Sequence, residues 1–331
     1  MDSLEGKVAI VAGATRGAGR GIACMLGQAG ATVYCTGRSV RGAPPTRGVH
    51  AGRPETIEET ATMVTAHGGR GIAVRVDHNE EAQVAALLRR VKDEQGRLDV
   101  LVNILGGDTP AEFKPFWKLS LDKGLRWLRQ EVGSHIITSR YAAQLMVEGA
   151  GGGLIVGLTD GDGLYYRGSL FYDLVKVSTI RLAYAMAEEL YKHRVASVAL
   201  TPGFLRTEWM LDHFGVTEAN WRDGAKKDAV FIASETPYFV GRAVAALAAD
   251  TRVLEKSGGV YASWTLSDEY GFTDIDGSRP HLGRYFAEHF NPLPWEPPKT
   301  GVRWKIEREP QASGKDDETI HETTRRDTKK V

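Results

Sequence analysis

Seven short apolar segments, separated by longer helical patterns, constrain the fold of this chain more than any other feature. The segments are rich in β-branched residues and lack polar alternation, as expected of parallel strands that are buried on both faces. They cover residues 7–13, 31–37, 71–77, 98–105, 153–159, 195–203 and 258–263. Helical periodicity fills the gaps, over residues 17–29, 54–67, 80–94, 121–147, 170–193 and 237–250.

This repeated alternation predicts an α/β protein with a single doubly wound Rossmann domain. Its parallel seven-stranded sheet is expected to be flanked by helices on both faces. The domain is predicted to span residues 1–290, with a lid over about residues 207–235. Residues 291–331 contain few apolar side chains and many charges, which predicts a flexible C-terminal extension.

Composition argues against several classes of function. The 331 residues include 42 basic and 42 acidic side chains, so no surplus of charge favours nucleic acid or an anionic membrane as a partner. No uncharged stretch approaches the roughly 20 apolar residues that span a bilayer, and the N-terminus lacks the pattern of a signal peptide. The only cysteines, Cys24 and Cys35, fit a reducing compartment, and the nine histidines lack metal-ligand spacing. We expect a cytoplasmic protein without a metal ion.

A glycine-rich turn, AGATRGAGRG, follows the first predicted strand and opens the first predicted helix. Gly13, Gly17 and Gly19 allow the backbone to turn tightly and to approach a pyrophosphate, whose negative charge the helix N-terminus favours. The intervening Thr15, Arg16 and Ala18 belong to the same turn. Its position in a βαβ unit predicts a dinucleotide site.

The end of the second predicted strand indicates which dinucleotide is bound. A carboxylate is expected there when the ribose 2′-hydroxyl of NAD is recognised, but the sequence reads YCTGRS and supplies Arg38 instead. Arg38 and Arg16 could hold a 2′-phosphate through charge-assisted hydrogen bonds. The sequence therefore favours NADP(H), with NAD(H) the less favoured cofactor.

The GxxxGxG spacing of this turn resembles the short-chain dehydrogenase/reductase family, and further motifs follow in the family's order. They are VDHNE, LVNILGG, YDLVK and LTPGFLRTE. The resemblance covers about residues 5 to 265. It is closest to the branch that contains mammalian dehydrogenase/reductase member 1 and its bacterial relatives, which GATVYCTGR, GRLDVLVN and YGFTDIDGSRP also resemble.

The resemblance implies roles for individual residues. Those expected to contact the cofactor, besides the glycine turn and Arg38, are Asp77, His78, Asn103, Pro202, Gly203 and Thr207. Tyr172 is implied as the catalytic acid/base. Lys176 lies four residues further on, on the same face of a predicted helix, where its ammonium would lower the pKa of the phenol toward the working range.

The sequence departs from the family where two serines are expected, because LTDGDG places Thr159 and Asp160 there. A serine can donate a hydrogen bond to the substrate oxygen, whereas an ionised aspartate can only accept one. Thr159 could donate while Asp160 turns outward. Alternatively, Asp160 could act as an acid or a base itself, or the redox site could be inactive or repurposed. We interpret Asp162 as a solvated turn residue.

A second departure places Glu131 where the family has an asparagine that anchors a relay water. Glu131 could relay protons, or the helix register could differ. The sequence thus predicts an NADP(H)-dependent oxidoreductase acting on a small carbonyl or alcohol. The alternatives are a non-redox isomerase or lyase that uses Asp160 and Glu131, and an inactive nucleotide-binding protein. Family resemblance implies a homodimer or homotetramer.

Overall fold

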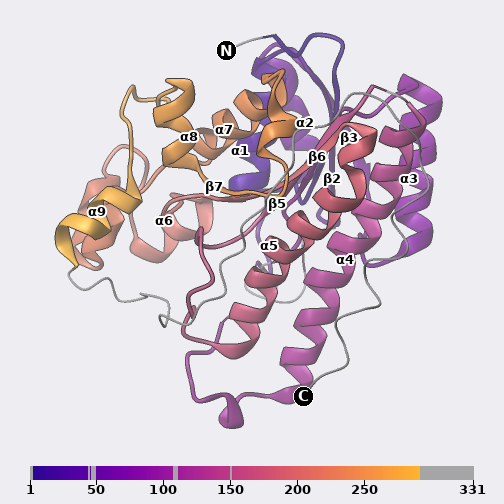
Figure 1. The fold of residues 1–331 in the computed structure, drawn as a ribbon. Coiled ribbons are helices and arrows are strands. Elements are labelled where there is room, and N and C mark those ends of the chain that lie inside the picture. The colour runs from indigo at the N-terminus through magenta and orange to yellow at the C-terminus, as the bar shows by residue number, and fades with distance from the viewer. Residues whose placement is uncertain (1–2, 44, 46–49, 107–110, 150, 291–331) are drawn as a thin grey trace. The chain divides into compact units, whose positions relative to one another are not determined.

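A seven-stranded parallel sheet forms the centre of the protein (Figure 1). Its strands lie in the order β3-β2-β1-β4-β5-β6-β7. They are β1 (Val8–Ala12), β2 (Thr32–Gly37), β3 (Arg70–Arg75), β4 (Val100–Asn103), β5 (Gly153–Leu158), β6 (Val195–Thr201) and β7 (Val260–Ala262). The predicted fold class is confirmed. The strands β1 and β6 are buried along their whole length, as their apolar sequences predict, whereas the edge strands β3 and β7 are partly exposed.

The structure is a computed structural model that describes residues 3–43, 45, 50–106, 111–149 and 151–290. These residues all fall in one unit, Met1–Pro298. The predicted extension, residues 291–331, lies outside the described residues. No helix within the described ranges is long and apolar enough to cross a membrane.

Six long helices lie where the sequence predicts them, and three short ones were not predicted. The long helices are α1 (Gly17–Gln28), α2 (Ile57–Ala66), α3 (Glu81–Gln95), α4 (Leu121–Glu148), α5 (Leu170–Leu190) and α7 (Pro237–Ala249). The short ones are α6 (Glu208–Phe214), α8 (Ser263–Tyr270) and α9 (Leu282–His289). A helix of about two turns leaves little periodic pattern of apolar residues in the sequence. The helix α6 depends on its caps, which are Thr207 at the start and Gly215, in the left-handed conformation, at the end.

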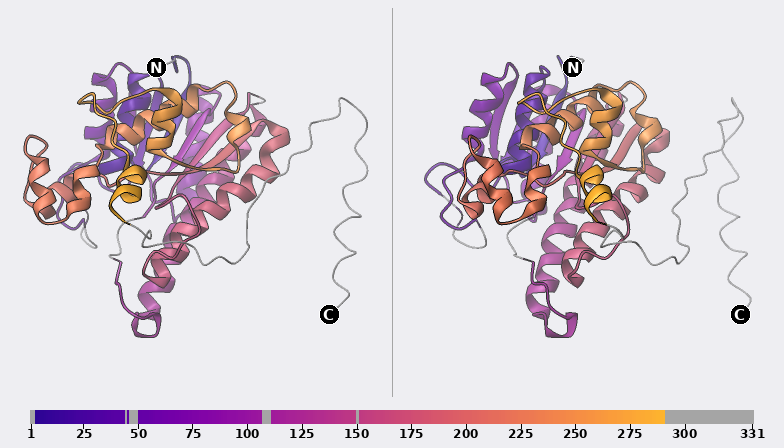
Figure 2. Two further views of the ribbon diagram at one scale, coloured as in Figure 1. Left: turned by 60° about the vertical axis from the view of Figure 1, so that its left-hand side comes forward. Right: turned by 90° about the vertical axis from the view of Figure 1, so that its left-hand side faces the viewer.

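Helices cover both faces of the sheet. Side chains of α1, α2 and α7, including Ile22, Val64 and Val244, pack on one face. Side chains of α3 and α4, including Leu87 and Met146, pack on the other. Both views of Figure 2 show α4 and α5 side by side, reaching beyond the edge of the sheet.

The strand order places the functional region. The chain leaves β1 toward β2 on one side and enters β4 on the other, so a crevice forms between the carboxyl ends of β1 and β4. Gly13 follows β1, Asn103 ends β4, Thr159 follows β5 and Pro202 follows β6. Residues far apart in the sequence therefore meet at one edge of the sheet.

Candidate active site

The glycine turn has the backbone conformation that its sequence predicts. Gly13 adopts a φ of +96° and Gly17 one of +51°, both in the region that favours glycine. A Cβ at Gly13 would lie 2.3 Å from the carbonyl oxygen of Ile104, and one at Gly19 would lie 2.0 Å from that of Gly13. Glycine is required here because β1, α1 and the segment after β4 approach one another closely.

The N-terminus of α1 already binds an anion, the side chain of Glu208. The Gly17 N–H donates to Glu208 Oε2 at 2.8 Å, and an Arg20 Nη1 lies 3.6 Å from Glu208 Oε1. A helix N-terminus that accommodates a carboxylate offers the amide donors and the dipole that a phosphate oxygen requires. These residues fit the pyrophosphate of a dinucleotide, provided that Glu208 gives way to it.

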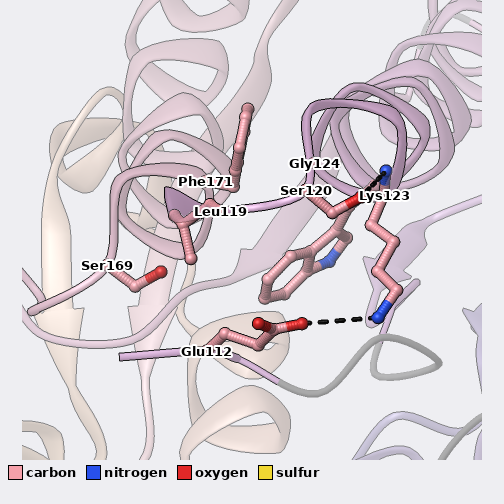
Figure 3. A pocket seen from close by; sticks show the side chains of 8 residues that line it. Glu112, Leu119, Ser120, Lys123, Gly124, Ser169 and Phe171 are labelled. Atoms are coloured by element: carbon pink, nitrogen blue, oxygen red, sulfur yellow. Dashed lines mark hydrogen bonds and ion pairs between the residues drawn. The ribbon is translucent and has the colours of Figure 1, made fainter. Parts of the chain in front are cut away.

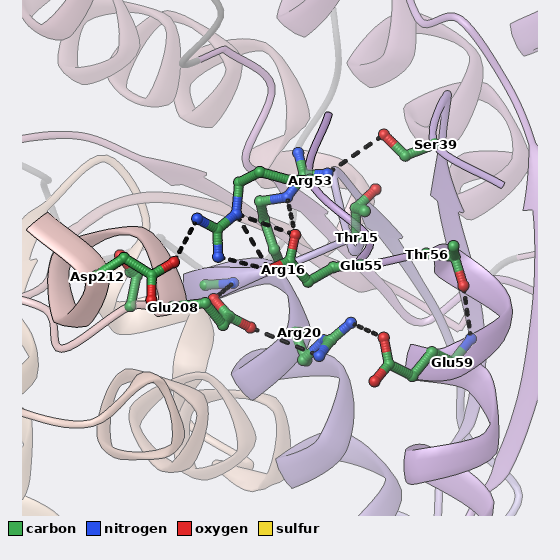
Figure 4. A network of polar contacts seen from close by, with 12 residues as sticks. Thr15, Arg16, Arg20, Ser39, Arg53, Glu55, Thr56, Glu59, Glu208 and Asp212 are labelled. Carbon is green, nitrogen blue, oxygen red and sulfur yellow. Dashed lines mark hydrogen bonds and ion pairs between the residues drawn. The ribbon is translucent and has the colours of Figure 1, made fainter. Parts of the chain in front are cut away.

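Beside this turn lies a network of charged side chains (Figure 4). Arg16 Nε donates to Glu55 Oε2 at 3.2 Å, and its Nη2 lies 3.5 Å from Ser39 Oγ. Arg53 Nη2 donates to Glu55 Oε1 at 2.6 Å and Nη1 to Asp212 Oδ2 at 2.8 Å. Sequence reasoning missed both Arg53, which lies in a Pro/Gly/Arg-rich loop over residues 40–54 without a periodic pattern, and Glu55 directly after this loop.

Arg38 and Asp77 lie at the ends of β2 and β3, as expected for the adenosine end of a dinucleotide site. Arg38 Nη1 is 3.9 Å from Asp77 Oδ2, and the Arg38 side chain is 51% exposed. His78 lies in the core. Its buried ring lies between Thr36 Oγ1, 2.8 Å from Nε2, and Thr138 Oγ1, 2.9 Å from Nδ1. Both ring nitrogens are therefore engaged within the core, and the predicted contact of His78 with the cofactor stays a prediction.

Two further segments border the crevice. Asn103 is buried and donates from Nδ2 to Ser139 Oγ at 2.9 Å, while its Oδ1 has no hydrogen-bond partner. The Gly203 N–H, after Pro202, donates to Glu235 Oε2 at 2.9 Å, and Ser263 Oγ donates to the same oxygen at 2.6 Å. Burial raises the pKa of Glu235 to about 8. Sequence reasoning missed Glu235, since a glutamate in a loop carries no signal of burial.

Tyr172 contacts Asp160, whereas Thr159 does not contribute to this pair. The Tyr172 hydroxyl donates to Asp160 Oδ2 at 2.5 Å. Thr159 is buried, and its hydroxyl donates to the carbonyl oxygen of Lys176 at 2.8 Å. The expectation that Thr159 donates while Asp160 turns outward therefore differs from the structure. Thr159 follows a strand whose side chains alternate, so it points toward α5 while Asp160 points to the crevice.

The electrostatics of Tyr172 also differ from expectation. Burial, followed by the charge of Asp160 and its hydrogen bond, raises the pKa of Tyr172 well above its usual range, and the charge of Glu131 acts in the same direction. Lys176 Nζ lies 5.6 Å from the centre of the Tyr172 ring, rather than at its hydroxyl. The expected lowering of this pKa by Lys176 is not found in the structure.

Lys176 is instead paired with Glu131. Its Nζ lies 3.3 Å from Glu131 Oε2, and the Trp127 Nε1–H donates to Glu131 Oε1 at 2.7 Å. Glu131 is buried on α4, so the helix register does bring it into this region. Gly106, with a φ of +145°, lies against it, and a Cβ there would be 1.9 Å from Glu131 Oε1. Removing one partner of such a buried pair leaves an uncompensated charge, which typically costs about 3–5 kcal/mol.

Arg167 holds the loop between β5 and α5, and sequence reasoning missed it. Its side chain is only 3% exposed. The guanidinium donates to the carbonyl oxygens of Asp160, Gly163 and Tyr165, and to Asp173 Oδ1 at 3.0 Å. Buried arginines are rare unless they are paired, and nothing in the sequence distinguishes this arginine from a solvated one.

A small cavity of about 20 Å³ lies between the start of α4 and the start of α5 (Figure 3). Its lining residues come from both helices and the segments before them: Glu112, Leu119, Ser120, Lys123, Gly124, Trp127, Ser169 and Phe171. Trp127 and Phe171 also pack near Tyr172.

The aromatic side chains Phe214, Trp221 and Phe231 of the predicted lid, by contrast, pack mainly on one another. Among the described residues, no group of three or more metal-ligating side chains could hold a metal ion.

A doubly wound sheet with a glycine turn and a tyrosine–lysine pair at its carboxyl edge defines a nucleotide-binding α/β oxidoreductase. Residues 7–214 match the family model described as short chain dehydrogenase. The chain belongs to the short-chain dehydrogenase/reductase family, whose members bind a nicotinamide cofactor.

Within this family the chain lies in the branch of dehydrogenase/reductase SDR family member 1. It is 38% identical to that protein from Mus musculus, over 86% of this chain and 87% of the relative. It is 36% identical to the protein from Homo sapiens, over 83% and 85%. A short chain dehydrogenase from Mycobacterium paratuberculosis, solved bound to NAD, shares the fold with a TM-score of 0.62 at 21% identity, over 78% of this chain and 97% of that chain.

Proposed function

We propose that this protein is an NADP(H)-dependent oxidoreductase that interconverts a carbonyl and an alcohol, with Tyr172 as the acid/base. The observation that carries this proposal is the Tyr172 hydroxyl bonded to Asp160, on the same edge of the sheet as the glycine turn. The bound cofactor would supply or accept the hydride. The residues of the chain orient the substrate oxygen and move its proton.

The contact between Tyr172 and Asp160 suggests a route for that proton. During alcohol oxidation, the substrate hydroxyl gives its proton to Tyr172 Oη as the proton of Tyr172 passes to Asp160 Oδ2. During carbonyl reduction, Tyr172 gives its proton to the substrate oxygen, and a proton from solvent reaches Tyr172 Oη through the exposed Asp160 carboxylate. A phenol with a raised pKa is protonated at neutral pH, so Tyr172 is in the form that donates a proton in carbonyl reduction. Lys176, paired with Glu131, keeps this part of the site electrically balanced.

The preference for NADP(H) rests on three guanidinium groups near the end of β2. Arg38 is exposed enough to reach a ligand, and Arg16 and Arg53 share a single carboxylate, Glu55. In this structure Arg38 also faces Asp77 and Arg53 also pairs with Asp212, so a 2′-phosphate would take the place of these carboxylates as the anion that the guanidinium groups bind. The Mycobacterium paratuberculosis relative was solved with NAD, so cofactor choice has to be measured for this chain.

Comparison of the two cofactors tests the proposal. Purified protein is mixed with NADPH or NADH and a panel of ketones, aldehydes and quinones, and oxidation of the cofactor is followed. We expect kcat/KM to be at least about tenfold higher with NADPH, and Arg38→Ala to reduce that preference. Equal use of both cofactors would contradict the assignment of NADP(H). NADPH that binds tightly but is not oxidised by any substrate would favour an inactive nucleotide-binding protein.

A second candidate function is supported by the two carboxylates of the site. Asp160 contacts Tyr172 and Glu131 contacts Lys176, an arrangement that could serve an isomerase or lyase. Turnover without any cofactor, lost in Asp160→Asn, would support this candidate over the redox enzyme.

We also propose that two copies of the chain associate through α4 and α5. Apolar side chains on these helices are exposed in the single chain, among them Leu125, Ile136 and Leu174. Light scattering should give at least twice the 36.2 kDa of one chain, and Ile136→Arg should reduce that mass.

A cytoplasmic location is proposed from Cys24 and Cys35, which are buried and form no disulfide.

A further inference from the structure

The loop that carries Asp160 is held mainly by one side chain. Residues 160–167 leave the end of β5 and return to the first turn of α5. Arg167 Nη2 donates to the Gly163 carbonyl oxygen at 2.8 Å, Nη1 to the Tyr165 carbonyl oxygen at 3.0 Å, and Nε to that of Asp160. The guanidinium therefore takes the place of the backbone hydrogen bonds that a strand or helix would provide.

The same guanidinium ties this loop to the helix that carries Tyr172. Asp173 Oδ1 accepts from Arg167 Nη1 at 3.0 Å and from the Arg167 N–H at 3.2 Å. Asp173 directly follows Tyr172 on α5. The buried Arg167 side chain thus contacts the backbone of Asp160 and the side chain next to Tyr172. The hydrogen bond of 2.5 Å between Tyr172 and Asp160 forms the centre of the site.

Charge at the site also depends on this arginine. The ammonium of Lys176 is matched by Glu131, so it does not offset the carboxylate of Asp160. Arg167 pairs with Asp173 and donates to the backbone carbonyl oxygen of Asp160, and its guanidinium carbon lies 4.8 Å from the centre of the Tyr165 ring. The positive charge of Arg167 lowers the pKa of Tyr172, against the larger effects of burial and Asp160.

We propose that Arg167 is a positioning residue for the reaction, which holds the backbone of Asp160 and the start of α5 so that the Asp160 carboxylate stays on the Tyr172 hydroxyl. This inference rests on the proposed function. Arg167 acts through Asp160 and Tyr172, so substrate binding should be affected less than turnover.

The test combines kinetics with hydrogen exchange on the full chain. We expect Arg167→Ala to lower kcat by about 100-fold, because small displacements of reacting groups have effects of that order, while KM for NADPH changes less than about threefold. Free guanidinium at millimolar concentration should restore at least about tenfold of the lost rate. Arg167→Lys should be intermediate, since an ammonium cannot reproduce the forked geometry of the contacts.

Hydrogen exchange provides a readout that does not require turnover. In Arg167→Ala, the amides of residues 160–168 should exchange at least about tenfold faster, while those of β5 and β6 remain protected. Arg242→Ala is the matched control, because Arg242 also holds a loop, through the carbonyl oxygens of Thr273 and Asp274 at 2.6 and 3.1 Å. That control should leave exchange in residues 160–168 and the response to guanidinium unchanged.

The outcomes separate this inference from the proposed function. Faster exchange at residues 160–168 in a protein that oxidises no NADPH would contradict the proposed function and leave the loop-holding role of Arg167 in place. The inference would be overturned if Arg167→Ala kept normal NADPH-dependent turnover. It would also be overturned if Arg167→Ala lost rate, guanidinium did not restore that rate, and Arg242→Ala showed the same loss.

Discussion

At the scale of single residues, the Asp160 carboxylate determines the behaviour of Tyr172. It accepts the phenolic hydrogen at 2.5 Å and, after burial, is the main reason that the pKa of Tyr172 is raised. A lysine four residues away would normally have the opposite effect, but Lys176 is engaged by Glu131. The motif of tyrosine and lysine is therefore present with its usual spacing and altered electrostatics.

Replacing Asp160 with serine should lower the pKa of Tyr172, since it removes both a negative charge and a hydrogen-bond acceptor. In carbonyl reduction Tyr172 must be protonated, so the alkaline limb of the profile of kcat/KM against pH should move to lower pH in Asp160→Ser. In the unmodified protein this limb should lie above the value of about 10 that is typical of a free phenol. Asp162→Ser, which removes an exposed carboxylate from the same loop, is the control. Identical alkaline limbs in all three proteins would argue against control of Tyr172 by Asp160.

At the scale of elements, the first turn of the short helix α6 contacts the glycine turn. Thr207 caps α6 by accepting from the Met210 N–H, and Glu208 in its first turn accepts from the Gly17 N–H. Asp212, on the next turn, accepts from Arg53. These contacts connect α6 to both ends of the proposed dinucleotide site, so we expect α6 to adjust if a phosphate replaces the carboxylate of Glu208.

We expect Glu208→Gln to bind NADPH about two- to fivefold more tightly, because charge interactions at a helix N-terminus are worth about 0.3–1 kcal/mol. Isothermal titration calorimetry at low salt measures this change. Glu59→Gln is a suitable control, since Glu59 also pairs with Arg20, whereas the Gly17 N–H donates to Glu208. If Glu208→Gln weakened binding, Glu208 would have to be a part of the cofactor site and not a competitor of the phosphate.

The elements differ in how far the sequence determines them. Long apolar runs and periodic helices predicted the sheet and six helices, because burial on one or both faces leaves a repeating pattern. The short helices α6, α8 and α9 depend on caps and tertiary contacts, which leave little pattern. The same holds in the site: the Tyr172–Lys176 spacing was visible, whereas the roles of Arg167 and Glu235 depend on burial that only the fold creates.

At the scale of the whole molecule, Glu235 joins three parts of the chain. It lies just before α7 and accepts from Gly203 after β6 and from Ser263 at the start of α8. Its side chain is buried, which raises its pKa to about 8. His78 and His135 are the opposite case, because burial lowers the pKa of each to about 4.

These values predict how stability varies with pH. The pKa of Glu235 is raised on folding, so its contribution is largest below its unfolded value and is lost as pH rises through about 8. The Tm of the protein should therefore fall from about pH 7 to about pH 8 and then level off. Both histidines are largely neutral in the folded and unfolded states over this range. Glu235→Gln should flatten the curve, whereas Glu218→Gln, at a more exposed position, should not. A Tm independent of pH between 7 and 9 would contradict the assignment.

The most direct test of the whole account is the activity of Tyr172→Phe, which removes one hydroxyl and leaves the ring. With NADPH and a carbonyl that the unmodified protein reduces, we predict a loss of about 10²- to 10⁴-fold in kcat, as expected for removal of a general acid. The Kd for NADPH should stay within about twofold, since the glycine turn and the arginine network are untouched. Undiminished NADPH-dependent reduction by Tyr172→Phe would contradict the central claim that the hydroxyl held by Asp160 carries the proton.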